Sequence, residues 1–203
     1  GSNLQIEEII VTAQKREQSA QDVPISITAL DEELLGSTIR NLSDITGYAP
    51  NVVFGENGRR PGGSSIQIRG IAAATSNDNT FDSPIAINVD GIYLGQAAGS
   101  LLDNFDMERI EILRGPQGTL FGKNTTGGVI NVIRTRPTGE FGGKVQATIG
   151  EDGRQELRAV INTSLADNLA AKFFGTSIQS DGWMPNITLG GHNGEEDYQA
   201  YGV

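Results

Sequence analysis

The stretch GPQGTLFGKNTTGG, residues 115–128, combines residue types that bind phosphate in nucleotide-binding loops. It is rich in glycine, and hydroxyl side chains follow closely behind Lys123. A phosphate-binding loop requires glycine, four residues of any type, and then Gly-Lys-Ser/Thr. Counting back from Gly122, the first glycine would fall on Gln117, and Asn124 stands where the magnesium-binding hydroxyl belongs. The spacing therefore argues against a nucleotide site and favours a glycine-rich turn region between two strands.

The other reactive side chains form no convincing catalytic or metal-binding pattern. His192 is the only histidine, and only loop carboxylates lie near it in the sequence. A metal site needs several converging ligands, and a Ser-His arrangement would have to form in this same loop. The carboxylate pairs Asp103/Asp106 and Glu108/Glu111 could do acid–base work, but they lie among strand and turn residues. We therefore predict no enzyme activity, no catalytic residue, no metal and no cofactor.

The composition narrows the class of protein further. The chain has 203 residues, enough for one large or two small domains, and a net charge of −10 without a dense basic stretch. This charge argues against a nucleic-acid partner. The absence of cysteine excludes a disulfide scaffold, and no apolar run approaches the roughly 20 residues of a membrane helix. Gly1-Ser2 looks like a cloning remnant, so we expect the natural N-terminus to lie elsewhere.

Short strands separated by loops dominate the first two thirds of the chain. Residues 9–12 read as an isolated strand, and residues 14–21 as a flexible tether that is too polar to pack. Alternation predicts a strand over 25–30, followed by a helix that Asp31 caps. Further strands are expected in NVVF, SIQIRG, IAINV, GIYLG, ERIEILRG and GGVINVIRT. Asp90-Gly91 suits a type I′ hairpin turn, and GENGRRPGGS and AAATSNDNTFDSP read as loops.

After Pro137 the alternating runs become longer. The strands KVQATIG and QELRAVINTSL place Val145, Ala147 and Ile149, and then Leu157, Ala159, Ile161 and Leu165, on one face. The side chains of Glu156, Arg158, Asn162 and Ser164 lie opposite. Runs of about 10 residues with this alternation are typical of transmembrane β-barrel strands. A soluble antiparallel meander with one face on a core would alternate in the same way.

Five segments, taken in order, resemble the plug domain of TonB-dependent outer-membrane receptors. They are EEIIVTA, VPISITALDEELL, IQIRGI, VDGIYLG and MERIEILRGPQGTLFGKNTTGGVINVIRTRP. The resemblance implies an α+β fold: a small mixed-sheet plug domain with short helices, followed by antiparallel strands of an incomplete transmembrane β-barrel. It divides the chain into a TonB-box segment and linker (1–22), a plug (23–137) and first barrel strands (138–203).

The same resemblance assigns roles to three groups of residues. The TonB box, expected to pair with TonB in the periplasm, would be Glu8, Ile9, Ile10, Val11, Thr12 and Ala13. Apical loop residues that would contact an extracellular small-molecule substrate are Arg59, Arg60, Asn77, Asp78, Asn79, Phe81 and Asp82. Contacts with the protein's own barrel would come from Arg109, Glu111, Arg114 and Arg134. The alternative for each group is a purely structural role. The TonB-box residues would be a strand of the plug core, the apical residues would be disordered loop tips, and the barrel-contact residues would be solvated charges on strand faces.

The resemblance further implies the cell outer membrane as location, lipid around the barrel strands, and a scarce nutrient such as a ferric siderophore as substrate. A barrel cannot close with so few strands. We therefore expect either a fragment of a receptor or a plug carried with its first strands. The alternative is a free-standing soluble β-rich ligand-binding module.

Overall fold

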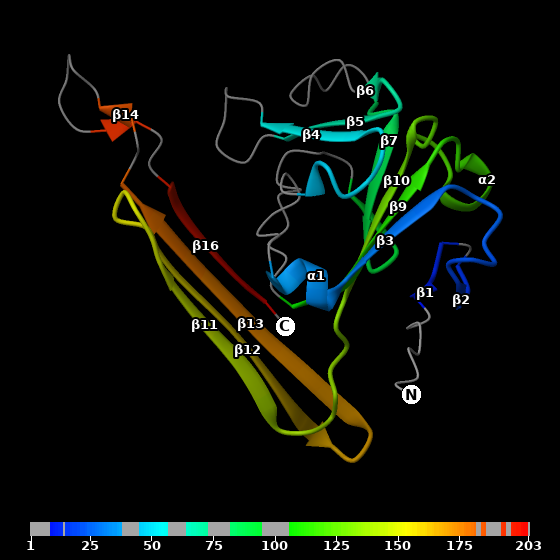
Figure 1. The fold of residues 1–203 in the computed structure, drawn as a ribbon. Helices are drawn as coiled ribbons and strands as arrows, with labels where there is room; N and C mark the ends of the chain where they lie inside the picture. The colour runs from blue at the N-terminus through cyan, green and yellow to red at the C-terminus, as the bar shows by residue number, and fades with distance from the viewer. Residues whose placement is uncertain are drawn as a thin grey trace, which may run out of the picture. The chain divides into compact units, whose positions relative to one another are not determined.

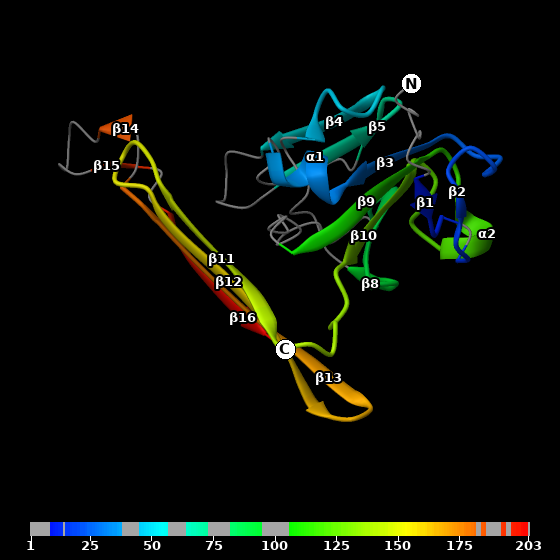
Figure 2. The same cartoon turned by 60° about the horizontal axis from the view of Figure 1, so that its bottom comes forward.

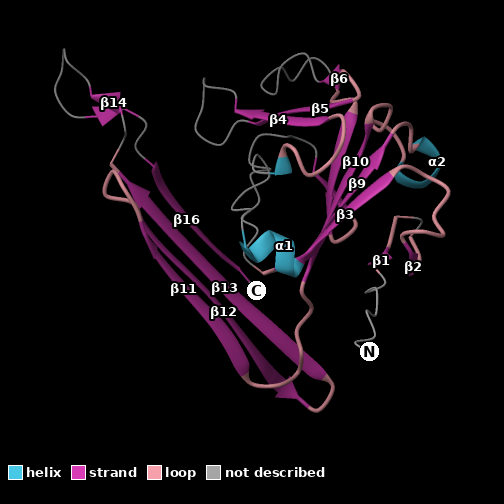
Figure 3. Ribbon diagram, viewed as in Figure 1, coloured by secondary structure: helices cyan, strands magenta, loops and turns pink. Residues whose placement is uncertain are grey.

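The computed structural model describes residues 9–13, 15–37, 45–56, 64–72, 82–94, 106–181, 184–185, 192–193 and 196–202. Within these ranges the chain is built mostly from strands with short helices (Figure 3). It divides into two compact units, Gly1–Arg134 and Thr135–Val203. Each unit has its own sheets, shown in Figure 1, and is described by itself.

A mixed five-stranded sheet forms the centre of the first unit. Its order is β3 (Ile27–Asp31), β9 (Met107–Arg114), β10 (Gly128–Arg134), β7 (Ile85–Val89) and β8 (Ile92–Leu94). β10 and β7 are parallel, and the other neighbours are antiparallel. The strands are rich in isoleucine and valine because β-branched side chains pack well on a pleated surface. The predicted mixed sheet is therefore confirmed.

One face of this sheet carries the main core of the unit. Ile110 and Ile112 of β9 and Ile130 and Val132 of β10 are fully buried there. They pack with α1 (Glu32–Ser37) and with a three-stranded sheet of β4 (Val52–Glu56), β5 (Ser64–Ile68) and β6 (Ile71–Ala72). The predicted cap of α1 is confirmed, since the Leu34 N–H donates to Asp31 Oδ1 at 3.0 Å.

The opposite face is covered by the N-terminal segment, residues 9–13 and 15–20. Here β1 (Ile10–Val11) pairs antiparallel with β2 (Gln18–Ser19), as Figure 2 shows. The side chains of Val11 and Ala13 are fully buried in a second cluster with Leu113 and Val129. The prediction of an isolated strand on a tether too polar to pack was therefore wrong. Backbone pairing does not depend on side-chain polarity, so the polar residues can supply β2.

The turn between β7 and β8 confirms the sequence prediction. Val89 faces Ile92 in register, leaving Asp90 and Gly91 as the two turn residues. Their φ angles are +50° and +82°, which is the type I′ combination. The Asp90 carboxylate also accepts a hydrogen bond from the Arg134 backbone N–H at 2.9 Å. This bond ties the hairpin to the end of β10.

The second unit contains a four-stranded antiparallel sheet. Its order is β11 (Gly142–Ile149), β12 (Gln155–Ala166), β13 (Leu169–Ser180) and β16 (Glu196–Gly202). A small hairpin of β14 (Met184–Pro185) and β15 (His192–Asn193) lies between β13 and β16 in the chain. The expected antiparallel strands after residue 138 are confirmed. The register also confirms the predicted shared face, since Val145 faces Ala159 and Ala147 faces Leu157.

The two faces of this sheet differ sharply in polarity. On one face Val145, Ile149 and Tyr201 are 71%, 88% and 89% exposed. The other face carries Glu156 and Arg158, which form an ion pair at 3.1 Å. Among the described residues, no helix has both the length and the apolar character needed to cross a membrane.

Candidate functional site

A row of polar side chains crosses the second face of the five-stranded sheet, beneath the N-terminal segment. Register places Glu111 of β9 beside Asn131 of β10, and Asn131 beside Asn88 of β7. Their exposed fractions are 0%, 6% and 5%. A carboxylate buried this deeply requires hydrogen-bond partners, because burial of an unpaired charge is very costly. The row therefore marks a place where the fold has built specific polar contacts.

Four donor atoms converge on the Glu111 carboxylate. Its Oε1 accepts the Thr12 backbone N–H at 2.6 Å, the Thr12 hydroxyl at 3.1 Å and Arg109 Nε at 2.9 Å. Its Oε2 accepts Asn131 Nδ2 at 3.1 Å. Arg109 Nη2 also reaches the Thr12 hydroxyl oxygen at 3.4 Å, and Arg109 pairs with Glu108. We call Thr12, Arg109, Glu111 and Asn131 the Glu111 cluster.

Thr12 directly follows β1, so the direction of its N–H can be worked out from the pairing of β1 with β2. The Ala20 N–H donates to the Ile9 carbonyl at 2.9 Å, and Ile10 faces Ser19 in register. Bonded and non-bonded pairs alternate along an antiparallel ladder, so Ile10 and Ser19 form a non-bonded pair. The N–H and C=O of Ile10 therefore point away from β2. The N–H of Thr12, two residues on, points to that same open edge.

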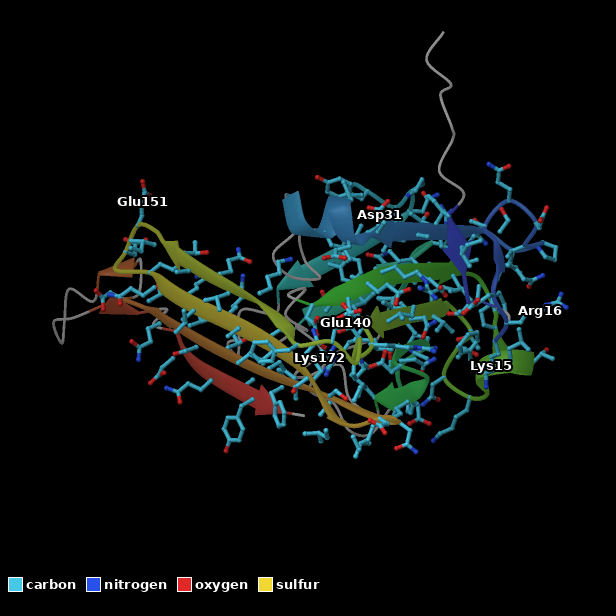
Figure 4. All side chains as sticks on the ribbon, turned by 90° about the horizontal axis from the view of Figure 1, so that it is seen from below. Lys15, Arg16, Asp31, Glu140, Glu151 and Lys172 are labelled. Carbon is cyan, nitrogen blue, oxygen red and sulfur yellow. The ribbon has the colours of Figure 1, made fainter. Side chains whose placement is uncertain are left out.

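Apolar and aromatic contacts hold the N-terminal segment around the Glu111 cluster. Val11 and Ala13 pack with Leu113, while Phe121 packs partly buried against the same cluster. The Lys15 ammonium lies 5.7 Å from the centre of the Phe121 ring, a cation–π distance. Figure 4 shows Lys15 beside α2 (Gly118–Phe121), the helix that carries this ring. The segment is thus docked through one buried polar anchor and a small apolar patch.

The loop between β9 and β10 has the structural role that its spacing favoured. It contains the single turn of α2, and Thr125 Oγ1 donates to the Gly122 carbonyl at 2.8 Å. Backbone bonds from Gln117 to Thr125 and from Gly115 to Gly127 close it. The loop therefore forms a turn closed by its own backbone bonds, and its Phe121 packs against the N-terminal segment.

Of the predicted TonB-box residues, Ile9 directly precedes β1, Ile10 and Val11 form it, and Thr12 and Ala13 follow it; Glu8 lies outside the described residues. Among the substrate-contact candidates, Arg59, Arg60, Asn77, Asp78, Asn79 and Phe81 also lie outside the described residues. Asp82 is described: its side chain is 67% exposed and lies 3.4 Å from Lys123 Nζ. Substrate contact stays a prediction for this whole group.

The four barrel-contact candidates occupy different surroundings. Arg109 and Glu111 belong to the Glu111 cluster. Arg114 donates to the carbonyl of Pro50 at 3.1 Å and to that of Ile27 at 3.5 Å, which ties β9 to two other segments. Arg134 ends β10 and bonds Asp90 through its backbone. Contact of any of them with a barrel wall stays a prediction.

Sequence reasoning missed the bond between Thr12 and Glu111. Alternation placed Glu111 on the face of β9 that does not carry Ile110 and Ile112, and a charged residue there indicates a solvated face. The available signal was Asn131, which gives the neighbouring strand a polar residue between isoleucine and valine. Two polar residues on the same face of adjacent apolar strands indicate a buried polar pair. The polar pair does not, however, identify Thr12, 99 positions away along the chain, as the third member.

The mixed five-stranded sheet, packed against α1 and covered by the docked N-terminal segment, defines the first unit as a small α+β domain. The chain belongs to the TonB-dependent Receptor Plug Domain family, whose model matches residues 19–129. The match spans β2 to the start of β10 and includes the closed glycine loop. The resemblance read from the five sequence segments is therefore confirmed.

Several curated proteins and solved structures are similar to this chain. The vitamin B12 transporter BtuB of Vibrio vulnificus is 29% identical over 86% of the chain and 28% of its own length. The ferrichrome outer membrane transporter/phage receptor of Escherichia coli is 30% identical over 77% of the chain and 20% of its own length. The ferric yersiniabactin uptake receptor FyuA of Yersinia pestis has a TM-score of 0.70 at 23% identity, over 87% of the chain and 27% of its own. The chain thus spans less than a third of each.

Proposed function

We propose that this chain is the plug and the first barrel strands of an outer-membrane active transporter that is driven by TonB. Its substrate would be a scarce nutrient, most simply a ferric siderophore. The family match supports the plug assignment, and relatives named as transporters for vitamin B12 and ferrichrome support a transport role. The apical residues around Arg59 and Asn77 remain our candidates for substrate contact.

The observation that carries the TonB proposal is the open edge of β1. A short β-branched strand with unpaired backbone groups on one side suits pairing with another protein's sheet edge. Ile10 directs its backbone N–H and C=O away from β2, and the residue is 42% exposed, so it is not consumed in the core. This edge of β1 supports the proposal that residues 8–13 are the TonB box.

The second unit supports an outer-membrane location. An apolar face that exposes Val145, Ile149 and Tyr201 is costly in water and favourable in lipid. The polar residues of the opposite face, such as Glu156 and Arg158, would line a lumen. This two-faced sheet argues against the free-standing soluble module. In the receptor that would contain this chain, the plug would face the periplasm from inside the barrel.

The test is the variant Ile10→Pro in the complete receptor. Proline removes an N–H donor, and at Ile10 that N–H lies on the open edge, so the β1–β2 pairing keeps its bonds. We expect capture by the periplasmic domain of TonB and substrate uptake to be lost, while substrate binding is unchanged. The matched control Ile10→Val keeps the donor and the β-branched shape, and should behave as the parent does.

Two outcomes would overturn the proposal. Capture by TonB that survives Ile10→Pro would mean that the open edge of β1 is not the pairing site. Loss of substrate affinity together with capture would mean that residues 8–13 are core structure of the plug and not a docking peptide.

A further inference from the structure

The buried carboxylate of Glu111 occupies the edge of β1 that a partner strand would need. Thr12 N–H points to the same open side as the backbone groups of Ile10, and Glu111 Oε1 accepts it at 2.6 Å. A strand that adds along this edge needs the same N–H as its own donor. Both bonds cannot form at once, because an amide carries a single hydrogen.

We infer that Glu111 is a positioning residue that latches the TonB box in a docked, pairing-incompetent state. The inference rests on the proposed function, and it adds the group that controls access to the box. Glu111 acts as a side-chain substitute for a third strand. Natural sheets protect exposed edges in comparable ways, with inward-pointing charges among them.

The strength of this latch follows from the charge and burial of the cluster. Three donors meet Oε1, and one of them is the guanidinium of Arg109. Hydrogen bonds to an ionised acceptor are roughly twice as strong as neutral ones. Asn131 holds Oε2 at 3.1 Å, so the carboxylate is fixed from the sheet side as well as from the box side. The anchor is therefore rigid, while the strand that it holds is paired over only two residues.

The Glu111 cluster is connected to the rest of the plug through Arg109. Arg109, which donates to both Glu111 and Thr12, lies in register with Asp31, the residue that caps α1. Arg109 and Glu111 lie on the same strand, and β9 is paired with β3 on one side and β10 on the other, so the sheet holds both side chains in place against Thr12.

Glu111→Gln is the decisive variant, because it keeps the shape of the side chain and removes its charge. Glu108→Gln is the matched control: Glu108 pairs with the same Arg109, but its side chain is 43% exposed and lies outside the Glu111 cluster. The chain has no cysteine, so Ile9→Cys introduces a unique thiol within it for a spin label. Ile9 is 42% exposed, and its label reports whether the box is docked.

In the complete receptor without substrate or TonB, we expect the label to be immobile in the parent and in Glu108→Gln. It should become mobile in Glu111→Gln. The periplasmic domain of TonB should bind unlabelled Glu111→Gln about tenfold more tightly than the parent, since less of the box is docked. A label that stays equally immobile in Glu111→Gln and Glu108→Gln would overturn the inference.

A second variant, and the comparison with Ile10→Pro, separate a failure of the latch from a failure of the proposed function. If Glu111→Gln fails to fold, Thr12→Pro replaces it: this variant leaves β9 intact and removes the N–H that Glu111 holds, and an unchanged label would again overturn the latch. If the label is released but TonB binds neither protein, the latch stands and the proposed function fails. If Ile10→Pro abolishes capture while Glu111→Gln changes nothing, the function stands and the latch fails.

Discussion

Gly128, the first residue of β10, lies where two backbones approach too closely for any side chain. A Cβ at this position would lie 2.4 Å from the carbonyl oxygen of Leu113 and 3.0 Å from Cδ1 of Ile68. Its φ of +152° is one that residues with a side chain rarely adopt. Leu113 and Ile68 are both 0% exposed, so neither can move aside into solvent. Gly128→Ala therefore combines backbone strain with overpacking in the core.

The expected cost follows from these two effects. Overpacking of a well-packed core costs about 1–3 kcal/mol, and a strained backbone costs a similar amount. We expect Gly128→Ala to lower the free energy of unfolding of the first unit by about 4 kcal/mol. With an unfolding entropy of roughly 2.1 cal/mol/K per residue, this corresponds to a fall in Tm of about 15 °C.

Gly122→Ala in the same loop is the matched control. Its φ is +79°, but no heavy atom lies within 4 Å of an added Cβ, so only backbone strain remains. We expect a loss of about 1 kcal/mol and a fall in Tm of about 4 °C. Thermal unfolding of the chain in mild detergent, followed by circular dichroism, measures both variants. Equal shifts for the two variants would refute the close approach of β9 and β10 at Gly128.

Two further predictions concern other parts of the chain. Asp90→Ala should lower the free energy of unfolding by about 1–2 kcal/mol, because it removes the bond to the Arg134 N–H and strains the positive φ at the turn; Asp90→Asn, measured by the same melts, should lose less. Limited proteolysis of the isolated chain should yield a resistant core that ends near Pro137, detected by mass spectrometry. A resistant monomeric fragment extending to Val203 would contradict that domain boundary.

Local features of the fold were determined by the sequence itself. Asp90-Gly91 specifies its turn because aspartate and glycine tolerate positive φ, and this preference needs no distant contact. Asp31 caps α1 through a bond to a residue three positions on. The alternation in residues 144–165 assigns each side chain to a face, since the period of a strand is two. Such features depend on neighbours in the chain, and a pattern of residue types is enough to predict them.

The candidate site was decided by the tertiary structure. Alternation separates Glu111 from Ile110 and Ile112, but it does not say what covers either face. The N-terminal segment covers the face of Glu111, and its polar residues 18 and 19 join it as β2. The Thr12–Glu111 bond then forms between residues 99 positions apart. A bond of this kind depends on how two segments pack in space, and the local pattern of the sequence carries no record of that packing.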